Sequence, residues 1–322
     1  MTTQEKWFGH VSTLVYDPVP TTRSSTRSAL SMLGFHHIEC VSTLETFKDS
    51  FSTLDPDLVV ADLSPDQESI CQLVRRLRKG EFSSSPFAVV IAITWESSEG
   101  VVQNALNCGT DSLLLRPFSA GQLKEHIQHH IENRKPFVVT SDYIGPDRRP
   151  NVQAGPSAEL IEVPNTLRAK AKRELQACSD HQKQIVEVRR AIRRKRIQSQ
   201  ARHVGVTAAL ILSQLAKPNT LFQIAAELRS MSAVAEDLLE SCGRENEFTP
   251  IVALSQGLIQ TIRQLRDALA TNDPSHHAAR PLALLTEFAR AVPLALDPMQ
   301  NEADVAREIA QTVERIRLRR VG

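Results

Sequence analysis

Four side chains with complementary chemistry stand at or just after the ends of short apolar runs in the sequence. In chain order they are Asp17, Asp62, Thr94 and Arg116. One carboxylate of such a set can attack a phosphoryl group while the carboxylates hold a magnesium ion that offsets the charge, and a hydroxyl and a cation can bind the phosphoryl oxygens. Each residue alone would be an ordinary polar residue at a strand end. The prediction of transient aspartate phosphorylation therefore depends on their meeting in space.

Short apolar runs alternate with amphipathic segments through the first part of the chain, and these must position the four side chains. Three of the five runs are nearly continuous in apolar residues, which is typical of strands covered by helices on both faces. The runs are Ser12–Tyr16, His36–Val41, Leu58–Asp62, Ala88–Thr94 and Ser112–Leu115. Apolar residues at helical spacing in Thr21–Leu33 and Gln67–Lys79, each followed by a glycine, predict helices.

Five strands alternating with five helices predict an α/β domain with one doubly wound, five-stranded parallel sheet. In such a sheet ligands bind beyond the carboxyl ends of the strands, which all lie at one edge. Because the four polar side chains come at the ends of their runs, we expect them to converge at that edge.

The motifs at these strand ends resemble those of the response regulator receiver family, which has a flavodoxin-like fold. The sequence PDLVVADLSP resembles the third strand and phosphoacceptor turn of the family, which implies that Asp62 is the phosphoacceptor. Thr94 matches the switch hydroxyl of the family, and Arg116–Phe118 (RPF) matches its Lys-Pro-Phe motif. The resemblance extends from Val11 to Arg134 and implies a magnesium site at Asp17 and Asp62.

The sequence also departs from the family pattern. The first strand of a receiver usually ends in two acidic residues, but here Asp17 is followed by Pro18, which weakens the implied magnesium site. Arg116 keeps the charge of the usual lysine without its compact ammonium group, and Leu113 stands at the aromatic switch position. The resemblance therefore implies an atypical or degenerate receiver, and its Arg116–Pro117 bond is expected to be cis.

Length and composition set limits on the rest. A chain of 322 residues is long enough for two domains, and a formal net charge of +1 favours neither nucleic acid nor an anionic membrane as a partner. Dispersed cysteines without a CxxC motif predict free thiols in a reducing compartment. They are Cys40, Cys71, Cys108, Cys178 and Cys242. The absence of a signal-peptide pattern and of a long apolar run predicts a cytoplasmic protein.

Residues 136–164 contain five prolines and predict a linker or strap between a receiver-like domain, 1–135, and an α-helical region, 165–322. Its VTSDYIGPDRR sequence resembles a tail that follows receiver-like domains in some proteobacterial signalling proteins. Apolar residues in it could strap the segment onto a domain surface, with Arg148 and Arg149 at its end: Phe137, Val138, Tyr143 and Ile144. A PilZ-type cyclic-dinucleotide motif is disfavoured because the residue four past Arg148 is Val152.

The helical region has few glycines and no strand-like runs, which predicts a helical bundle that serves as an output or dimerisation unit. The expected helices run from Asn165, a plausible N-cap, to about Gln200, and then over Thr207–Lys217, Asn219–Ser241, Thr249–Ala270, Pro281–Ala295 and Asn301–Arg319. Histidine phosphotransfer chemistry is disfavoured because neither His181 nor His203 is followed by the Lys-Gly that such domains carry.

A basic stretch from Arg189 to Arg196 stands out in this region. It suggests contact with phosphates of nucleic acid or a membrane, a solvated helix face, or a partner for the acidic stretch Glu236–Glu247. Nucleic acid is the weaker alternative because no aromatic residues are interleaved and no helix-turn-helix follows.

We therefore expect a cytoplasmic signal-transduction protein rather than an enzyme: an atypical response regulator in a phosphorelay through Asp62, with a histidine kinase or other signalling protein as partner. A homodimer through the helical region fits this pattern. The alternative is an unphosphorylated receiver that serves as an interaction or scaffold module, with a basic helix that contacts an anionic partner.

Overall fold

The computed structural model describes residues 8–64, 66–82, 86–149, 160–173, 177–215, 221–243, 249–269, 280–288 and 291. The chain divides into two compact units, Met1–Ile192 and Arg193–Gly322. Among the described helices, none has both the length and the apolar character needed to span a membrane.

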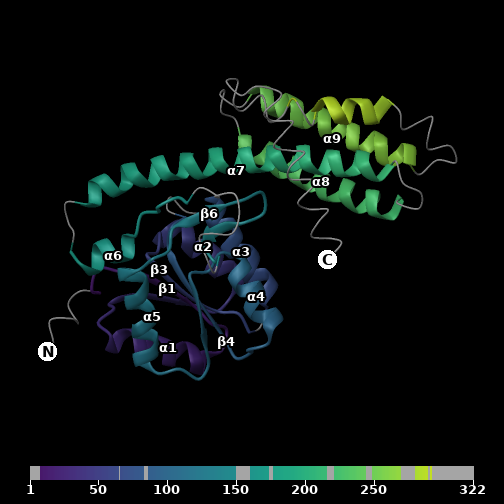
Figure 1. Ribbon diagram of the computed structural model, residues 1–322. Helices are drawn as coiled ribbons and strands as arrows, with labels where there is room; N and C mark the ends of the chain where they lie inside the picture. The colour runs from purple at the N-terminus through teal and green to yellow at the C-terminus, as the bar shows by residue number, and fades with distance from the viewer. Residues whose placement is uncertain are drawn as a thin grey trace. The chain divides into compact units, whose positions relative to one another are not determined.

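The first unit contains the predicted five-stranded parallel sheet, with strand order β2-β1-β3-β4-β5. This order confirms the predicted α/β class (Figure 1). Strands and helices alternate as β1 (Ser12–Tyr16), α1 (Pro20–Met32), β2 (His37–Val41), α2 (Leu44–Leu54), β3 (Leu58–Asp62), α3 (Gln67–Lys79), β4 (Val89–Thr94), α4 (Glu99–Asn107), β5 (Ser112–Leu115) and α5 (Ala120–Glu132).

Each face of the sheet has its own apolar core. One core joins α2, α3 and α4 to alternate strand residues such as Leu14 and Val59, and the other joins α1 and α5 to Val15 and Val60. Because both faces are covered, all residues of β3 and β4 are buried, which explains their continuous apolar sequences. Gly80, with φ of 78°, ends α3 in the left-handed conformation.

After α5 the chain forms a buried hairpin of β6 (Phe137–Val139) and β7 (Ile144–Pro146), which realises the predicted strap. Its apolar side chains cluster with Phe87 and with Ile192 of α7 (Ala177–Leu215). The hairpin lies close to the loop between α4 and β5, since a Cβ on Gly145 would be 2.8 Å from the Cα of Gly109. Glycine at both positions allows the two backbones to meet.

The unit that contains the sheet extends to Ile192, beyond the boundary at residue 135 that the sequence predicts. The hairpin is one reason, and the short helix α6 (Thr166–Ala171) is another, because Leu167 and Ala171 join the core on the α1 and α5 face of the sheet. Lys170 Nζ also lies 2.6 Å from the Asp57 carboxylate.

The second unit is helical, as predicted. The part of α7 after Ile192 packs with α8 (Leu221–Cys242) and α9 (Thr249–Leu269) around a core that includes Val204, Met231 and Ile262. Residues 280–288 are also helical. The predicted helix Asn301–Arg319 lies outside the described residues.

The predicted helix boundaries at the start of the helical region were wrong in two places. A single helix from Asn165 was expected, but α6 ends at Ala171 and Arg173 has φ of 54°, a left-handed conformation that interrupts the helix. A break before Thr207 was also expected, but α7 continues to Leu215 because burial of Val204 and Ala208 stabilises it across Gly205. Asn165 does cap α6, as its side chain accepts the Arg168 N–H.

We predict that Phe137→Ala destabilises the sheet-containing unit by about 3–5 kcal/mol, because the Phe137 side chain is fully buried against Phe87. Urea denaturation of the full chain in a Trp7→Phe background, which leaves Trp95 as the single fluorescent tryptophan, measures this. Val186→Ala, at a residue 48% exposed, is the matched control and should have little effect. Equal, small effects of the two substitutions would mean that the hairpin does not fold with the sheet.

Candidate functional site

The structure brings Asp17, Asp62, Thr94 and Arg116 to the same edge of the sheet. Asp62 is the last residue of β3, and Thr94 is the last residue of β4. Asp17 directly follows β1, and Arg116 directly follows β5. Asp17, Asp62 and Thr94 are at most 3% exposed. Burial at the carboxyl ends of parallel strands makes this edge the candidate site.

The guanidinium of Arg116 bridges the two carboxylates. Arg116 Nη2 lies 2.8 Å from Asp17 Oδ2, and Arg116 Nε lies 3.1 Å from Asp62 Oδ2. The Arg116 side chain is only 6% exposed, so both ion pairs are largely shielded from water. The planar guanidinium offers donors in fixed directions, which allows one side chain to bind two separate carboxylates.

The second oxygen of each carboxylate accepts a backbone N–H of the following turn. Asp17 Oδ1 accepts from Val19 N at 2.8 Å, and Asp62 Oδ1 accepts from Ser64 N at 2.8 Å. All the carboxylate oxygens of the pair are therefore engaged. Arg23, on α1, donates from Nη1 to the backbone oxygen of Asp17 at 2.6 Å, which places a second guanidinium beside the pair.

Aromatic side chains surround this bridge. The guanidinium carbon of Arg116 lies 5.8 Å from the ring centre of Trp95 and 5.3 Å from that of Phe118, within the range of cation–π attraction. Burial, and then the carboxylates of Asp66, Asp62 and Asp17, raise the pKa of the Tyr16 hydroxyl. The Tyr16 hydroxyl therefore stays protonated and uncharged at neutral pH.

Thr94 lies at the same edge but outside the ion-pair bridge. Its hydroxyl accepts the N–H of Glu96 at 3.1 Å, and its backbone oxygen accepts the N–H of Arg116 at 2.8 Å. Thr94 therefore fixes the start of the segment that carries Arg116. In the register of β3 and β4, Asp62 pairs with Ile93, so Thr94 comes one residue beyond Asp62 at the carboxyl ends of the strands.

The donor set does not fit a magnesium ion. Magnesium prefers six oxygen ligands in near-octahedral geometry, and a two-carboxylate site needs free carboxylate oxygens. Here those oxygens face a guanidinium and two N–H groups, and Pro18 adds no side-chain oxygen. Within the described residues, no group of three or more His, Cys, Asp or Glu side chains could hold a metal ion.

Comparison with known proteins supports the family that the motifs suggest. The response regulator receiver domain family matches residues 13–128, which span β1 to α5. Residues 13–128 are a response regulator receiver domain. Receiver domains commonly bind magnesium. In this receiver, by contrast, the carboxylate oxygens that would bind magnesium already have protein donors.

The chemotaxis protein CheY1 of Helicobacter pylori is 26% identical to this chain over 117 residues, which cover 36% of this chain and 92% of the relative. The signal receiver domain of a Clostridium thermocellum histidine kinase is similar in structure, with 19% identity, a TM-score of 0.35, and coverage of 38% of this chain and 98% of that domain. A response regulator of Burkholderia multivorans has 23% identity, a TM-score of 0.33, and coverage of 38% and 96%.

The other predicted details of the receiver can also be located. The Arg116–Pro117 bond is cis, as the RPF motif implied. Leu113, at the position expected for the switch aromatic, is partly buried against the core on the α2, α3 and α4 face. The described cysteines Cys40, Cys71, Cys108 and Cys242 are free, as predicted, whereas the side chain of Cys178 lies outside the described residues.

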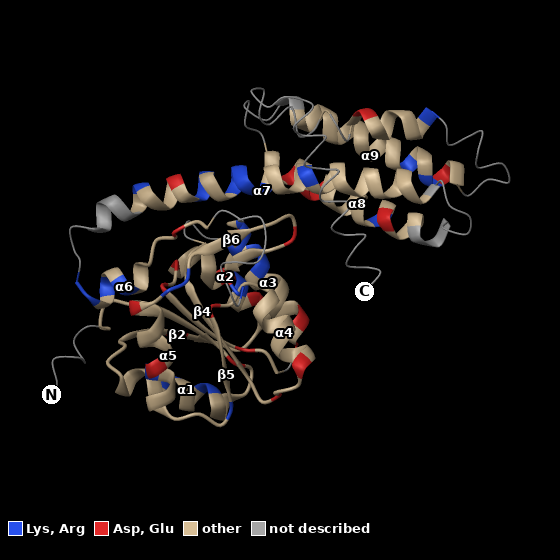
Figure 2. Cartoon of the chain, viewed as in Figure 1, with Lys and Arg blue, Asp and Glu red and all other residues tan. Residues whose placement is uncertain are grey.

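The basic stretch is partly used inside the helical unit. Arg193 donates from Nε to Ser241 O at 2.6 Å and from Nη2 to Cys242 O at 2.7 Å, and so caps the carboxyl end of α8. Arg196 pairs with Asp237. The predicted pairing with the acidic stretch thus exists through Asp237. Figure 2 shows Lys and Arg recurring along α7, and Arg190 among them is exposed.

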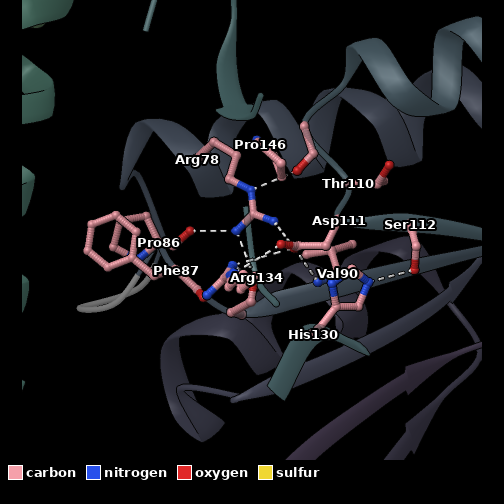
Figure 3. Close-up of polar contacts among 12 residues, drawn as sticks. Arg78, Pro86, Phe87, Val90, Thr110, Asp111, Ser112, His130, Arg134 and Pro146 are labelled. Atoms are coloured by element: carbon pink, nitrogen blue, oxygen red, sulfur yellow. Dashed lines mark hydrogen bonds and ion pairs between the residues drawn. The ribbon is translucent and has the colours of Figure 1, made fainter. Parts of the chain in front are cut away.

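A second buried polar network, which the sequence did not reveal, lies at the opposite edge of the receiver sheet (Figure 3). Asp111, just before β5, pairs with Arg78 at 2.7 Å and with Arg134 at 3.0 Å, and accepts the N–H of Val90. Arg78, fully buried, also donates to the backbone oxygens of Gly109, Pro86 and Ala88.

The donors of this network go to protein acceptors, and its members connect β4, β5, α3 and the segment before the hairpin. We therefore interpret it as structural. Although burial raises the pKa of Asp111, the guanidiniums of Arg134 and Arg78 outweigh this, and the net pKa is lower than usual. His130 lies beside it, with Nε2 2.9 Å from the Ser112 hydroxyl. Burial is the main reason that the pKa of His130 falls to about 4.

We predict that Arg116→Met destabilises the receiver by about 3–5 kcal/mol at neutral pH, because it leaves two buried carboxylates without their shared cation. Chemical denaturation followed by circular dichroism measures this. Arg75→Met is the control, since the Arg75–Glu68 pair is exposed and should contribute less than about 1 kcal/mol. A loss for Arg116→Met no larger than that of the control would contradict the bridge.

We further predict that His130 makes the receiver less stable as pH falls from about 6.5 to about 4. In this window the unfolded chain binds a proton at this residue and the folded chain does not, so acid favours unfolding. Protonation of Asp111, whose pKa is lowered, reduces the free energy of unfolding further only at more acidic pH. His130→Gln should flatten the dependence of the unfolding free energy on pH in the upper window.

The control for this prediction is His129→Gln, at the exposed neighbouring histidine. Denaturation series at stepwise pH compare the two variants with the parent chain. Identical slopes for both variants would show that His130 does not set the pH dependence.

Proposed function

We propose that this chain is a cytoplasmic signal-transduction protein, an atypical response regulator that takes part in a phosphorelay through Asp62. The observation that carries the proposal is the position of Asp62, which ends a fully buried strand of a receiver sheet and shares Arg116 with Asp17. The expected phosphoryl donor is a histidine kinase, which is the usual partner of this family. The chain itself acts as a receiver of the signal and not as an enzyme.

In the proposed reaction a carboxylate oxygen of Asp62 forms a bond with phosphorus, and the bond between phosphorus and the donor histidine nitrogen breaks, with the electron pair left on that nitrogen. Arg116 and Thr94 are the residues that bind the phosphoryl oxygens in this proposal. Arg116 is already 3.1 Å from Asp62, so little movement brings its donors to a phosphoryl group on that residue.

The charge change gives this reaction a structural consequence. A phosphoryl group on Asp62 competes with Asp17 for the guanidinium of Arg116, and so favours a second arrangement of the bridge. Because Arg116 directly follows β5, the second arrangement of the bridge would shift the segment that connects β5 to α5. The helical unit then serves as the output or dimerisation region.

A second function is favoured by one specific observation, that both carboxylate oxygens of Asp62 already have partners. One accepts the Ser64 N–H, and the other is paired with Arg116. In that case the receiver is an unphosphorylated interaction or scaffold module. Trp95 and Leu115, at the same edge as the pocket, are 56% and 43% exposed and offer apolar contact to a protein partner. The exposed part of the basic helix, such as Arg190, would contact an anionic partner.

We predict that acetyl phosphate, or the cognate kinase with ATP, adds one phosphoryl group to the full chain, and that Asp62→Asn abolishes the addition because it removes the nucleophile. Mass spectrometry of the intact protein measures the added group. Asp66→Asn is the matched control, because Asp66 is an exposed N-cap of α3 and asparagine caps a helix equally well.

Labelling that survives Asp62→Asn would move the acceptor to another residue. No labelling under any condition, in magnesium buffer or with kinase, would remove the phosphorelay and leave the interaction module.

A further inference from the structure

We propose that Arg116 is the resident cation of the acidic pocket and takes the place of the divalent metal ion that receiver domains commonly use. The pocket of Asp17, Asp62 and Arg116 is then complete without magnesium, and the group that it accepts from outside is an anion with phosphoryl chemistry. The inference concerns the site of the proposed function and deepens it.

The first support is the inventory of acceptors. Each oxygen of the two carboxylates has one donor: Val19 N and Ser64 N bind the Oδ1 atoms, and Arg116 binds both Oδ2 atoms. A metal ion that bound the pair through the Oδ2 atoms would have to displace the guanidinium. At the position where the family has a second acidic residue, Pro18 supplies no side-chain ligand to compensate.

The second support is the balance of charge. The guanidinium of Arg116 pairs with both carboxylates, and that of Arg23 binds the backbone oxygen of Asp17. Fixed positive charge therefore already offsets part of the carboxylate charge before any ion enters. A divalent ion gains least where positive charge is already fixed nearby, and magnesium gives up its own water ligands reluctantly.

The third support is that the guanidinium is held from several sides. Trp95 and Phe118 lie within cation–π distance of it, and the side chain is largely buried. A flat, rigid fork in this setting reaches two carboxylates at once, which the point charge of a lysine ammonium does less well. Arg116 at the position of the family's lysine and Pro18 at the position of its second acidic residue then have one effect in common: both favour a guanidinium over a metal ion in the pocket.

The consequence for phosphorylation rests on the proposed function. With acetyl phosphate as donor, an Asp62 oxygen bonds to phosphorus, the bond from phosphorus to the acetyl oxygen breaks, and acetate leaves with the electron pair. Arg116 supplies the positive charge that offsets the phosphoryl oxygens. The transfer therefore needs no divalent ion.

The experiment first measures metal binding, independently of phosphorylation. The full chain carries two tryptophans, so Trp7→Phe leaves Trp95, beside Arg116, as the single fluorescent reporter. Magnesium chloride is titrated to high millimolar concentration with calorimetry in parallel. The expected result is no saturable signal by either method. Saturable millimolar binding that Asp17→Asn abolishes would overturn the inference.

A gain-of-binding variant tests the cause. In the same background Pro18→Asp with Arg116→Lys supplies the second carboxylate and the compact cation, and it should acquire saturable magnesium binding. Its control is Pro18→Ala with Arg116→Lys, which removes the same proline and guanidinium without adding a ligand, and it should not bind. Binding by the control equal to that of the gain variant would contradict the role given to the pair of exchanges.

Phosphoryl labelling then separates this inference from the proposed function. With acetyl phosphate, the initial labelling rate of the parent chain should differ by less than about twofold between EDTA and magnesium. The gain variant should lose about tenfold or more in EDTA. Labelling of the parent chain that requires magnesium overturns the inference. Failure to label in both buffers overturns the phosphorelay alone, because the titration has already decided metal binding.

Discussion

The receiver buries two carboxylates at one edge of its sheet, and their charge must be balanced there. Asp17 and Asp62 stand where β1 and β3 end, so their positions follow from the parallel register of the sheet and cannot be moved apart without changing the fold. Receiver domains commonly bind magnesium, and the Lys-Pro-Phe motif of the family supplies a lysine. Here the guanidinium of Arg116 binds both carboxylates, and the segment after β5 is held in place by the same two ion pairs.

The two edges of the sheet use arginine in different ways. At the opposite edge Arg78 is surrounded by backbone oxygens and by Asp111. Its hydrogen bonds therefore connect α3 to the segments that precede β4 and β5. These hydrogen bonds of Arg78 all go to protein acceptors, which suits a structural role. At the site edge Arg116 is shared between two acids, and in the proposed function a phosphoryl group on Asp62 changes that sharing.

The sequence predicted the elements whose patterns are local. The strand LVVAD and the helix Gln67–Lys79 have the predicted bounds, because continuous apolar residues, helical spacing and Gly80 mark them unambiguously. It also predicted the convergence of Asp17, Asp62, Thr94 and Arg116, since the carboxyl ends of parallel strands share an edge.

What the sequence did not reveal depends on tertiary contacts. Arg78 lies in a run of basic residues at the end of α3 and resembles the partly exposed Arg75 and the exposed Arg76, yet it is fully buried. The sharing of Arg116 between two acids could not be read from its place in RPF, because the direction of a long side chain is set by its partners. Likewise, burial of Val204 carries α7 past Gly205, which local propensity would take as a break.

The most direct test of the resident cation is a crystal structure grown with manganese chloride, since Mn²⁺ has the same preference for oxygen ligands as Mg²⁺ and can be located by anomalous scattering. If Arg116 is the cation of the pocket, the map will show its guanidinium between Asp17 and Asp62 and no anomalous peak there. An anomalous peak between the two carboxylates, with Arg116 displaced, would contradict it.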